Sequence, residues 1–276
     1  MNWHCDAPPV APMSALAWLR FGLRAGILGV VTYGGLVLLL VVRGIEWPVF
    51  GMNRPWTPRI TQTVCRMAMA IMGIGLTVRG VPMRQRGAMV ANHASWLDIF
   101  ALNACAPMYF VAKSEVSGWA GIGWLARATG TVFIARKGTE AKRQQQMFED
   151  RLRAGHRLMF FPEGTSTDSR RVLPFKSTLF AAFFTHGLEA VMHIQPVTVI
   201  YRAPEGADPR FYGWWGDMTF AGHLVAVLSA RRRGAVEVIF HPDVPVDAFT
   251  NRKDLSTYCE RVIATAHPDL ERATDP

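Results

Sequence analysis

The stretch VANHASWLDIF, residues 90–100, follows an apolar run and places His93 five residues before Asp98. If Ser95 caps a helix, Asp98 falls in the first helical turn, as in a capping box with a shorter acid. That interpretation gives the histidine no role. In the alternative, a tight strand-to-helix turn lets Asp98 bind the imidazole, which fixes the tautomer and leaves the other ring nitrogen as a base. The spacing alone leaves both interpretations open.

Short apolar runs alternate with amphipathic stretches on both sides of this turn. Strands are expected at 75–81, 87–92, 108–113, 131–136, 157–164, 194–202 and 235–241. Helices are expected from Ser95, over 114–127, 139–155 and 176–189, and from Lys253. This alternation predicts an α/β fold with a mixed, mostly parallel central sheet flanked by helices. In such folds, functional residues gather at the strand ends.

The N-terminal part of the chain has the composition of a membrane anchor. Residues 25–42 are uncharged and lie between Arg24 and Arg43, close to the roughly 20 residues that a membrane span needs. No small-residue cleavage site follows, which favours a retained helix over a signal peptide. A second apolar stretch, 67–76, is either an interfacial helix or an ordinary buried one. We expect residues 1–78 to form two membrane-anchoring helices and residues 79–276 to form one catalytic domain.

Composition narrows the class of partner. Half of the 276 residues are hydrophobic, and 30 Lys and Arg against 21 Asp and Glu give a formal charge of +9. Such an excess suits an anionic membrane surface or an acidic carrier protein. No nucleic-acid-binding motif accompanies the charge, so we expect no nucleic-acid partner. The four cysteines are scattered and His93 and Asp98 lack further ligands at metal-site spacing, so we expect no metal.

Three further motifs follow the histidine turn in order. They are G-x-x-F-I-x-R at 130–136, F-P-E-G-T at 161–165 and the apolar strand QPVTVIY at 195–201. Together with N-H-x-x-x-x-D at 92–98, this series resembles the glycerolipid acyltransferase family typified by lysophosphatidate acyltransferase. The resemblance runs from about Gly80 to Arg202. It implies an α/β domain on a two-helix membrane-binding motif. It implies no cofactor apart from the acyl thioester donor, which would be an acyl carrier protein thioester or acyl-CoA.

The resemblance also implies roles for individual residues. His93 becomes the general base and Asp98 its orienting partner, while the substrate supplies the attacking hydroxyl. The implied substrate-binding residues are Arg136, Glu163, Gly164, Thr165, Ser166 and Lys176. Plainer interpretations stay open for three of them: Glu163 as a cap of the following turn, Gly164 as a residue of positive φ, and Arg136 as part of a solvated basic edge.

Position 166 departs from the commonest family pattern. Members with a phosphate-bearing acceptor usually read F-P-E-G-T-R, whereas this chain has Ser166. A hydroxyl does not reproduce the forked, charged grip of a guanidinium on phosphate, although Arg136, Arg170 and Arg171 remain nearby in sequence. The turn resembles the bacterial branch that acylates lyso-ornithine lipid.

The sequence therefore predicts an O-acyltransferase of membrane lipid biosynthesis that converts lyso-ornithine lipid to ornithine lipid. The alternatives are a 1-acylglycerol-3-phosphate acyltransferase that makes phosphatidate and a non-catalytic lipid-binding protein. The expected partners are the bilayer, a lyso-lipid acceptor and an acyl carrier protein or acyl-CoA donor. The expected location is the bacterial inner membrane, with the catalytic domain facing the cytoplasm.

Overall fold

A mixed sheet organises the chain. The computed structural model describes residues 6, 8, 13–134, 141–184 and 188–267. Within these ranges the strands are β1 (Ile74–Arg79), β2 (Gly87–Ala91), β3 (Tyr109–Lys113), β4 (Val132–Ile134), β5 (Leu158–Phe160), β6 (His193–Arg202), β7 (Gly234–Phe240) and β8 (Val244–Pro245). Their order is β1-β7-β6-β2-β5-β3-β4, with β8 beside β6. Only the β6–β7 and β6–β8 pairs are antiparallel, which confirms the predicted fold class.

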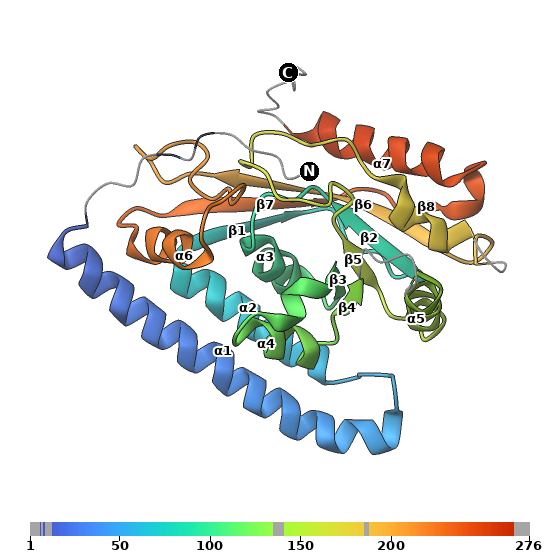
Figure 1. The fold of residues 1–276 in the computed structure, drawn as a ribbon, viewed down its shortest axis with the longest axis horizontal. Coiled ribbons are helices and arrows are strands. Elements are labelled where there is room, and N and C mark those ends of the chain that lie inside the picture. The colour runs from blue at the N-terminus through green and yellow to red at the C-terminus, as the bar shows by residue number, and fades with distance from the viewer. Residues whose placement is uncertain (1–5, 7, 9–12, 135–140, 185–187, 268–276) are drawn as a thin grey trace.

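Helices cover both faces of this sheet (Figure 1). They are α1 (Ala15–Phe50), α2 (Thr57–Met72), α3 (Leu97–Cys105), α4 (Ile122–Ala128), α5 (Ala141–Arg153), α6 (Phe220–Ser229) and α7 (Arg252–Ala266). Alternate residues of β2 point to opposite faces. Met89 and Ala91 pack into one core with α2 and α3, and Ala88 and Val90 pack into the other core with α5 and α7.

The first helix is longer than the sequence predicts and is attached to the domain near both ends. It spans 36 residues, about 54 Å at 1.5 Å per residue, whereas the uncharged stretch covers only 25–42. Near its start, Arg20 and Arg24 donate hydrogen bonds to the Ser229, Leu228 and Ala230 carbonyls at the end of α6. Near its end, buried Glu46 accepts the Trp56 and Thr57 N–H groups. These acceptors satisfy the free N–H groups at the start of α2.

The second apolar stretch is divided between a helix and a strand. Residues up to Met72 complete α2, and Gly73 in left-handed conformation ends that helix before β1 begins. One face of α2, including Cys65, Ala68 and Met69, is buried in the core. This packing matches the buried-helix interpretation of the segment. The predicted domain boundary at residue 78 lies inside β1, which pairs with β7 along its whole length.

Other elements also differ from the sequence-based expectation. The helix expected over 114–127 is divided into the 3-10 helix η1 (Ser114–Gly118) and α4, and β8 was not expected. The segment expected to be an α-helix over 176–189 forms a 3-10 helix, η3, at Ser177–Phe184. Its buried Phe180 and Phe183 pack against Phe160 of β5. This tertiary packing holds the segment in the 3-10 conformation, whereas periodicity predicts a regular α-helix. The helix α6 was not predicted at all. Its Thr219 N-cap accepts the Gly222 N–H and marks its start.

Candidate active site

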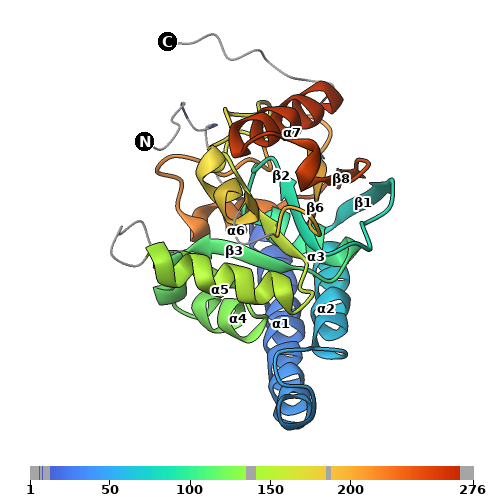
Figure 2. The same cartoon turned by 90° about the vertical axis from the view of Figure 1, so that its right-hand side faces the viewer.

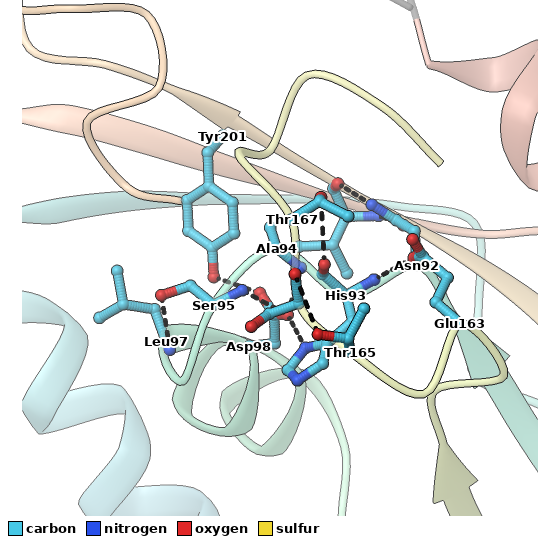
Figure 3. A network of polar contacts seen from close by, with 12 residues as sticks. Asn92, His93, Ala94, Ser95, Leu97, Asp98, Glu163, Thr165, Thr167 and Tyr201 are labelled. Carbon is cyan, nitrogen blue, oxygen red and sulfur yellow. Dashed lines mark hydrogen bonds and ion pairs between the residues drawn. The ribbon is translucent and has the colours of Figure 1, made fainter. Parts of the chain in front are cut away.

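The two central motifs meet because their strands are neighbours. β2 and β5 are parallel and pair with Val90 opposite Phe160. His93 and Glu163 each lie three residues beyond this pair, at the carboxyl ends of the two strands, where α/β folds place their sites. Figure 3 shows the resulting network of polar contacts around the turn between β2 and α3.

His93 and Asp98 form a hydrogen-bonded dyad. Nδ1 of the imidazole lies 2.7 Å from Oδ2 of Asp98. That oxygen also accepts the Ala94 and Ser95 N–H groups at 2.9 and 3.1 Å. Because this carboxylate oxygen acts as an acceptor throughout, His93 carries its proton on Nδ1. Nε2 then holds the lone pair and can accept a proton.

Asp98 binds both the imidazole and backbone N–H groups at the start of α3. Asp98 lies in the first turn of α3 and accepts the Ala94 and Ser95 N–H groups before the helix, whereas the N-cap is Trp96 and not Ser95 as a capping box would require. The same oxygen orients the imidazole. The carboxylate is fully buried, and four hydrogen bonds compensate for that burial. The backbone N–H bonds therefore hold the carboxylate in place for the dyad.

The fourth bond comes from a residue that sequence reasoning missed. Tyr201, near the end of β6, donates its hydroxyl proton to Oδ1 of Asp98 at 2.9 Å. Burial, followed by the charge of Asp98, raises the pKa of Tyr201 well above its usual value, so this hydroxyl stays a donor. The period-two pattern of QPVTVIY was the available signal, since it puts Val197, Val199 and Tyr201 on the α3 face of the sheet.

Asn92 is a second residue that sequence reasoning quoted but gave no role. Its side-chain amide donates to the carbonyl of Val199 and accepts the N–H of the same residue, each at 2.8 Å. The buried amide thus pairs with β6 in the way that a backbone group would. This pairing fixes the turn immediately before His93.

The imidazole is held on one side and accessible on another. Its ring stacks on Phe161 at 4.0 Å between centroids and 11° between planes. The side chain is 20% exposed, and Nε2 has no hydrogen-bond partner among the described residues. A reacting hydroxyl can therefore approach the nitrogen that is able to take its proton.

Glu163 joins the two motifs through backbone contacts. Oε1 accepts the His93 N–H at 2.6 Å and Oε2 accepts the Leu173 N–H at 2.8 Å. Burial raises the pKa of this carboxyl to about 8, against the lowering effect of the two N–H bonds. Glu163 thus clamps the histidine turn to the loop over residues 164–173. The predicted shaping of the acceptor site by Glu163 would act through this clamp.

The other residues of the F-P-E-G-T turn lie around the dyad. Gly164 has φ 71°, and a Cβ there would lie 2.8 Å from Nζ of Lys176, so both proposed substrate-binding residues meet at one point. Thr165 is partly exposed and Ser166 is buried. Thr167 N–H donates to the His93 carbonyl at 2.9 Å, which ties the loop to the histidine a second time.

Two arginines of the loop after Glu163 bind the same carboxylate in different ways. Arg171 forms a two-pronged ion pair with buried Asp168, through Nε at 3.1 Å and Nη2 at 2.9 Å. Arg170 donates its backbone N–H to the same carboxylate. Arg136 lies outside the described residues. No group of three or more metal-ligating side chains occurs in the part of the chain that the structure describes.

Comparisons with known proteins identify the family. A sequence profile described as Acyltransferase matches residues 76–200. The chain is 60% identical over 262 residues to the lyso-ornithine lipid O-acyltransferase of Rhodobacter capsulatus, covering 95% of each protein. The chain belongs to the acyltransferase family. The enzyme of the same name from Rhizobium meliloti is 35% identical, with 87% of this chain and 82% of that protein covered.

The fold of this acyltransferase also has a solved counterpart. The crystal structure of the 1-acyl-sn-glycerophosphate acyltransferase PlsC from Thermotoga maritima superposes with a TM-score of 0.62 at 21% identity. The match covers 91% of this chain and 92% of that one. The likeness therefore extends over most of both chains. At this identity the likeness establishes the architecture of the acyltransferase.

Proposed function

We propose that this acyltransferase transfers a fatty acyl group from an acyl thioester to the hydroxyl of lyso-ornithine lipid, giving ornithine lipid. The 60% identity to an enzyme of that name, over 95% of both chains, carries the proposal. Ser166 supports it, because a neutral hydroxyl stands where members with a phosphate-bearing acceptor usually carry an arginine. The pairing of Arg171 with Asp168 adds support, since the charge of that guanidinium already has a partner.

The dyad would act as a general base. Nε2 of His93 takes the proton of the acceptor hydroxyl as its oxygen attacks the thioester carbonyl carbon. The carbon–sulfur bond then breaks, and the proton passes from the imidazolium to the departing thiolate. Asp98 holds the ring and stabilises the imidazolium. Glu163, Gly164, Thr165, Ser166 and Lys176 would shape or line the acceptor site.

Initial rates with two acceptors test the proposal. Purified protein receives one acyl thioester and either lyso-ornithine lipid or lysophosphatidate. We expect faster transfer to the aminolipid, with His93→Ala lowering the rate by about 10²–10⁴-fold while the protein stays folded, as for removal of a general base. Faster transfer to lysophosphatidate would assign the enzyme to phosphatidate synthesis. No transfer to either acceptor would support a non-catalytic lipid-binding role.

The donor and location belong to the same proposal. We infer that acyl carrier protein or acyl-CoA supplies the acyl group at the cytoplasmic face of the bacterial inner membrane. The net charge of +9 favours an acidic carrier and an anionic leaflet. The exposed apolar side chains along α1, such as Leu19, Val30 and Val37, favour burial in the bilayer interface. Comparing rates with both thioesters distinguishes the donors.

A further inference from the structure

Two exposed tryptophans lie on the segment that joins β3 to β4. The 3-10 helix η1 and the helix α4 form most of this segment, and its Trp119 and Trp124 are 40% and 64% exposed. Ala120, beside Trp119, and Arg127, one turn after Trp124, are exposed as well. We call Trp119, Ala120 and Trp124 the α4 face.

The backbone of the segment holds the two indole rings in place. The Gly123 N–H donates to the Trp119 carbonyl at 2.8 Å, and Nη1 of Arg127 donates to the Ser117 carbonyl at 2.7 Å. A Cβ at Gly123 would collide with that same carbonyl, so the glycine lets α4 pack closely on η1. The α4 face is therefore a fixed surface of the folded domain.

The α4 face adjoins the exposed apolar face of α1. Gly121, which precedes α4, lies so close to the Tyr33 hydroxyl that a Cβ there would collide with it. Trp124 is three residues further on and lies on the same side of α4. On α1, Val30 and Val37 share the side of Tyr33 and are 75% and 62% exposed. Figure 1 and Figure 2 both show α4 beside α1, so the two helices present one continuous apolar surface.

The size and composition of this surface suit a lipid bilayer. Exposed apolar side chains occur along α1 from Leu16 to Phe50, a distance of about 50 Å at 1.5 Å per residue. An apolar surface of this length on a helix is typical of contact with a membrane. Tryptophan favours the membrane–water interface, and an arginine stem can lie along apolar surface while its charge reaches the head groups. Trp124 with Arg127 one turn away has this composition.

The same segment also reaches the dyad. η1 follows the carboxyl end of β3, a parallel neighbour of β5, so it begins at the sheet edge that carries His93 and Glu163. Trp119 packs edge-on against Trp214 at 6.2 Å between ring centroids. The Trp214 N–H donates to the carbonyl of Ala94, the residue after His93, at 2.9 Å. Trp214 alone therefore connects the α4 face with the dyad turn.

We propose that the α4 face is a second membrane-docking surface, which presents the dyad to lipids at the bilayer interface. The proposal rests on the proposed function, because the acceptor is a membrane lipid whose hydroxyl must reach Nε2 of His93. A domain attached through α1 alone can rotate about the axis of that helix. A second contact at α4 prevents this rotation and keeps the carboxyl edge of the sheet towards the lipid.

Fluorescence quenching in vesicles tests the position of Trp124. The full chain is reconstituted in vesicles of phosphatidylcholine and phosphatidylglycerol, and the quencher is either bromine on the lipid chains or acrylamide in the water. The signal of Trp124 is the difference between the wild-type protein and Trp124→Phe. We expect brominated lipid to remove most of this signal and acrylamide to remove little of it.

Val81→Trp is the matched control. Val81 is apolar and 70% exposed, and it lies beyond the end of β1. Since β1 runs in the opposite direction to β2, this position is at the sheet edge away from the dyad. The signal added by Val81→Trp should be removed by acrylamide and kept in brominated lipid.

Transfer rates test what the contact does. Trp124→Glu places a charge in the interface and should lower transfer to an acceptor in vesicles by about tenfold, while transfer in detergent micelles changes by less than about twofold. Val81→Glu places the same charge at the opposite sheet edge and should change neither rate by more than about twofold. Equal losses in the two variants would contradict the proposal.

The quenching readout does not depend on turnover. Lipid quenching of Trp124 without transfer to lyso-ornithine lipid would support the docking surface and count against the proposed function. Transfer to that acceptor with Trp124 quenched by acrylamide and not by lipid would overturn the docking surface alone. Protection from acrylamide that appears only when acyl carrier protein is added would assign the α4 face to the donor protein, which also overturns the proposal.

Discussion

The buried carboxylate of Asp98 depends on four donors, and Tyr201 supplies the one to Oδ1. The other three bonds converge on Oδ2, from the imidazole and from two backbone N–H groups. A carboxylate held at both oxygens keeps one orientation, and an imidazole bound to it keeps one tautomer. Tyr201 is therefore a positioning residue for the dyad, since it touches Asp98 and not the surface where substrate would bind.

Substituting this tyrosine tests the positioning role. Tyr201→Phe should lower kcat by about tenfold, the scale of one hydrogen bond to a charged group, and leave KM unchanged. The acidic limb of the pH–rate profile should move to higher pH, because a carboxylate with one donor fewer favours the protonated imidazole.

Tyr212→Phe is the matched control. Tyr212 packs against Tyr201 at 5.6 Å between ring centroids but its hydroxyl accepts the Gly234 N–H instead. This variant should alter stability and leave the pH profile in place. An equal shift of the profile in both variants would show that packing, and not the bond to Asp98, is responsible.

Glu163 makes stability depend on pH. Its pKa is about 8 in the folded protein against an ordinary value of 4.5, so the folded state binds more protons between these values. The free energy of unfolding should therefore fall as pH rises from about 4.5 to about 8. Glu163→Gln should flatten this part of the curve and cost about 1–3 kcal/mol, because one of the two N–H groups loses its acceptor.

Urea unfolding at a series of pH values measures this effect. Glu205→Gln is the control, because it removes a carboxylate from an exposed ion pair with Arg232 at the surface. It should keep the slope of the wild-type curve. A Glu163→Gln variant with an unchanged slope would assign the pH dependence to other groups.

Local spacing predicted His93 and Asp98 because both belong to one short turn. Tyr201 and Asn92 went without a role because their bonds join residues more than 100 positions apart, and the pairing of β2 with β6 brings them together. Glu163 was predicted as a site residue, but its contacts with two backbone N–H groups follow only from the register of β2 and β5. The sequence thus indicates the reacting groups more readily than the groups that hold them.

Among the elements, α1 is joined to the end of α6 by hydrogen bonds from Arg24. Nη1 of Arg24 donates to the Leu228 and Ala230 carbonyls at 3.0 and 2.8 Å, which satisfies acceptors at the end of α6 and places a cation at the negative end of that helix.

Arg24→Ala should lower the free energy of unfolding by about 1.5–3 kcal/mol, the range for hydrogen bonds to charged groups. Arg231→Ala, at an exposed position beside the same helix end, should have little effect. Chemical denaturation of both variants in the same detergent makes the comparison, and equal stabilities would contradict this role for Arg24.

The elements that were predicted well have strong local signals. The strands β2, β3, β6 and β7 follow apolar runs whose bounds differ from the expected ones by a residue or two at most. The start of α1 was missed because Arg20 and Arg24 interrupt the apolar pattern, although their charges are used against α6. The 3-10 conformation of η3 depends on aromatic packing with Phe160, which periodicity does not record.

For the molecule as a whole, α1 belongs to two environments. Leu28 and Leu39 are buried within the protein, and α1 pairs with α2 and reaches α6 (Figure 1). Much of the remaining surface of α1 is apolar and exposed. In the most apolar 18-residue stretch of this helix, only 17% of the residues are buried inside the protein. A helix that is attached near both ends and about 54 Å long suits a position along the membrane surface better than a perpendicular span of roughly 30 Å.

Deletion of residues 1–45 should therefore do more than release the protein from the membrane. It removes Leu28, Leu39 and the arginines that bind α6, and it uncovers the α2 surface that packs against α1. We expect weaker vesicle binding together with an unfolding temperature lower by several degrees, since loss of about 1 kcal/mol alone shifts a domain of this size by roughly 2–4 °C.

Deletion of residues 1–13 keeps the Ser14 cap of α1 and serves as the control. Thermal unfolding in detergent and vesicle flotation measure the two effects separately. A truncated protein that leaves the vesicles but keeps the unfolding temperature of the full chain would show that α1 is an anchor alone. Loss of both properties would show that the anchor is also part of the fold that holds His93 and Asp98 in place.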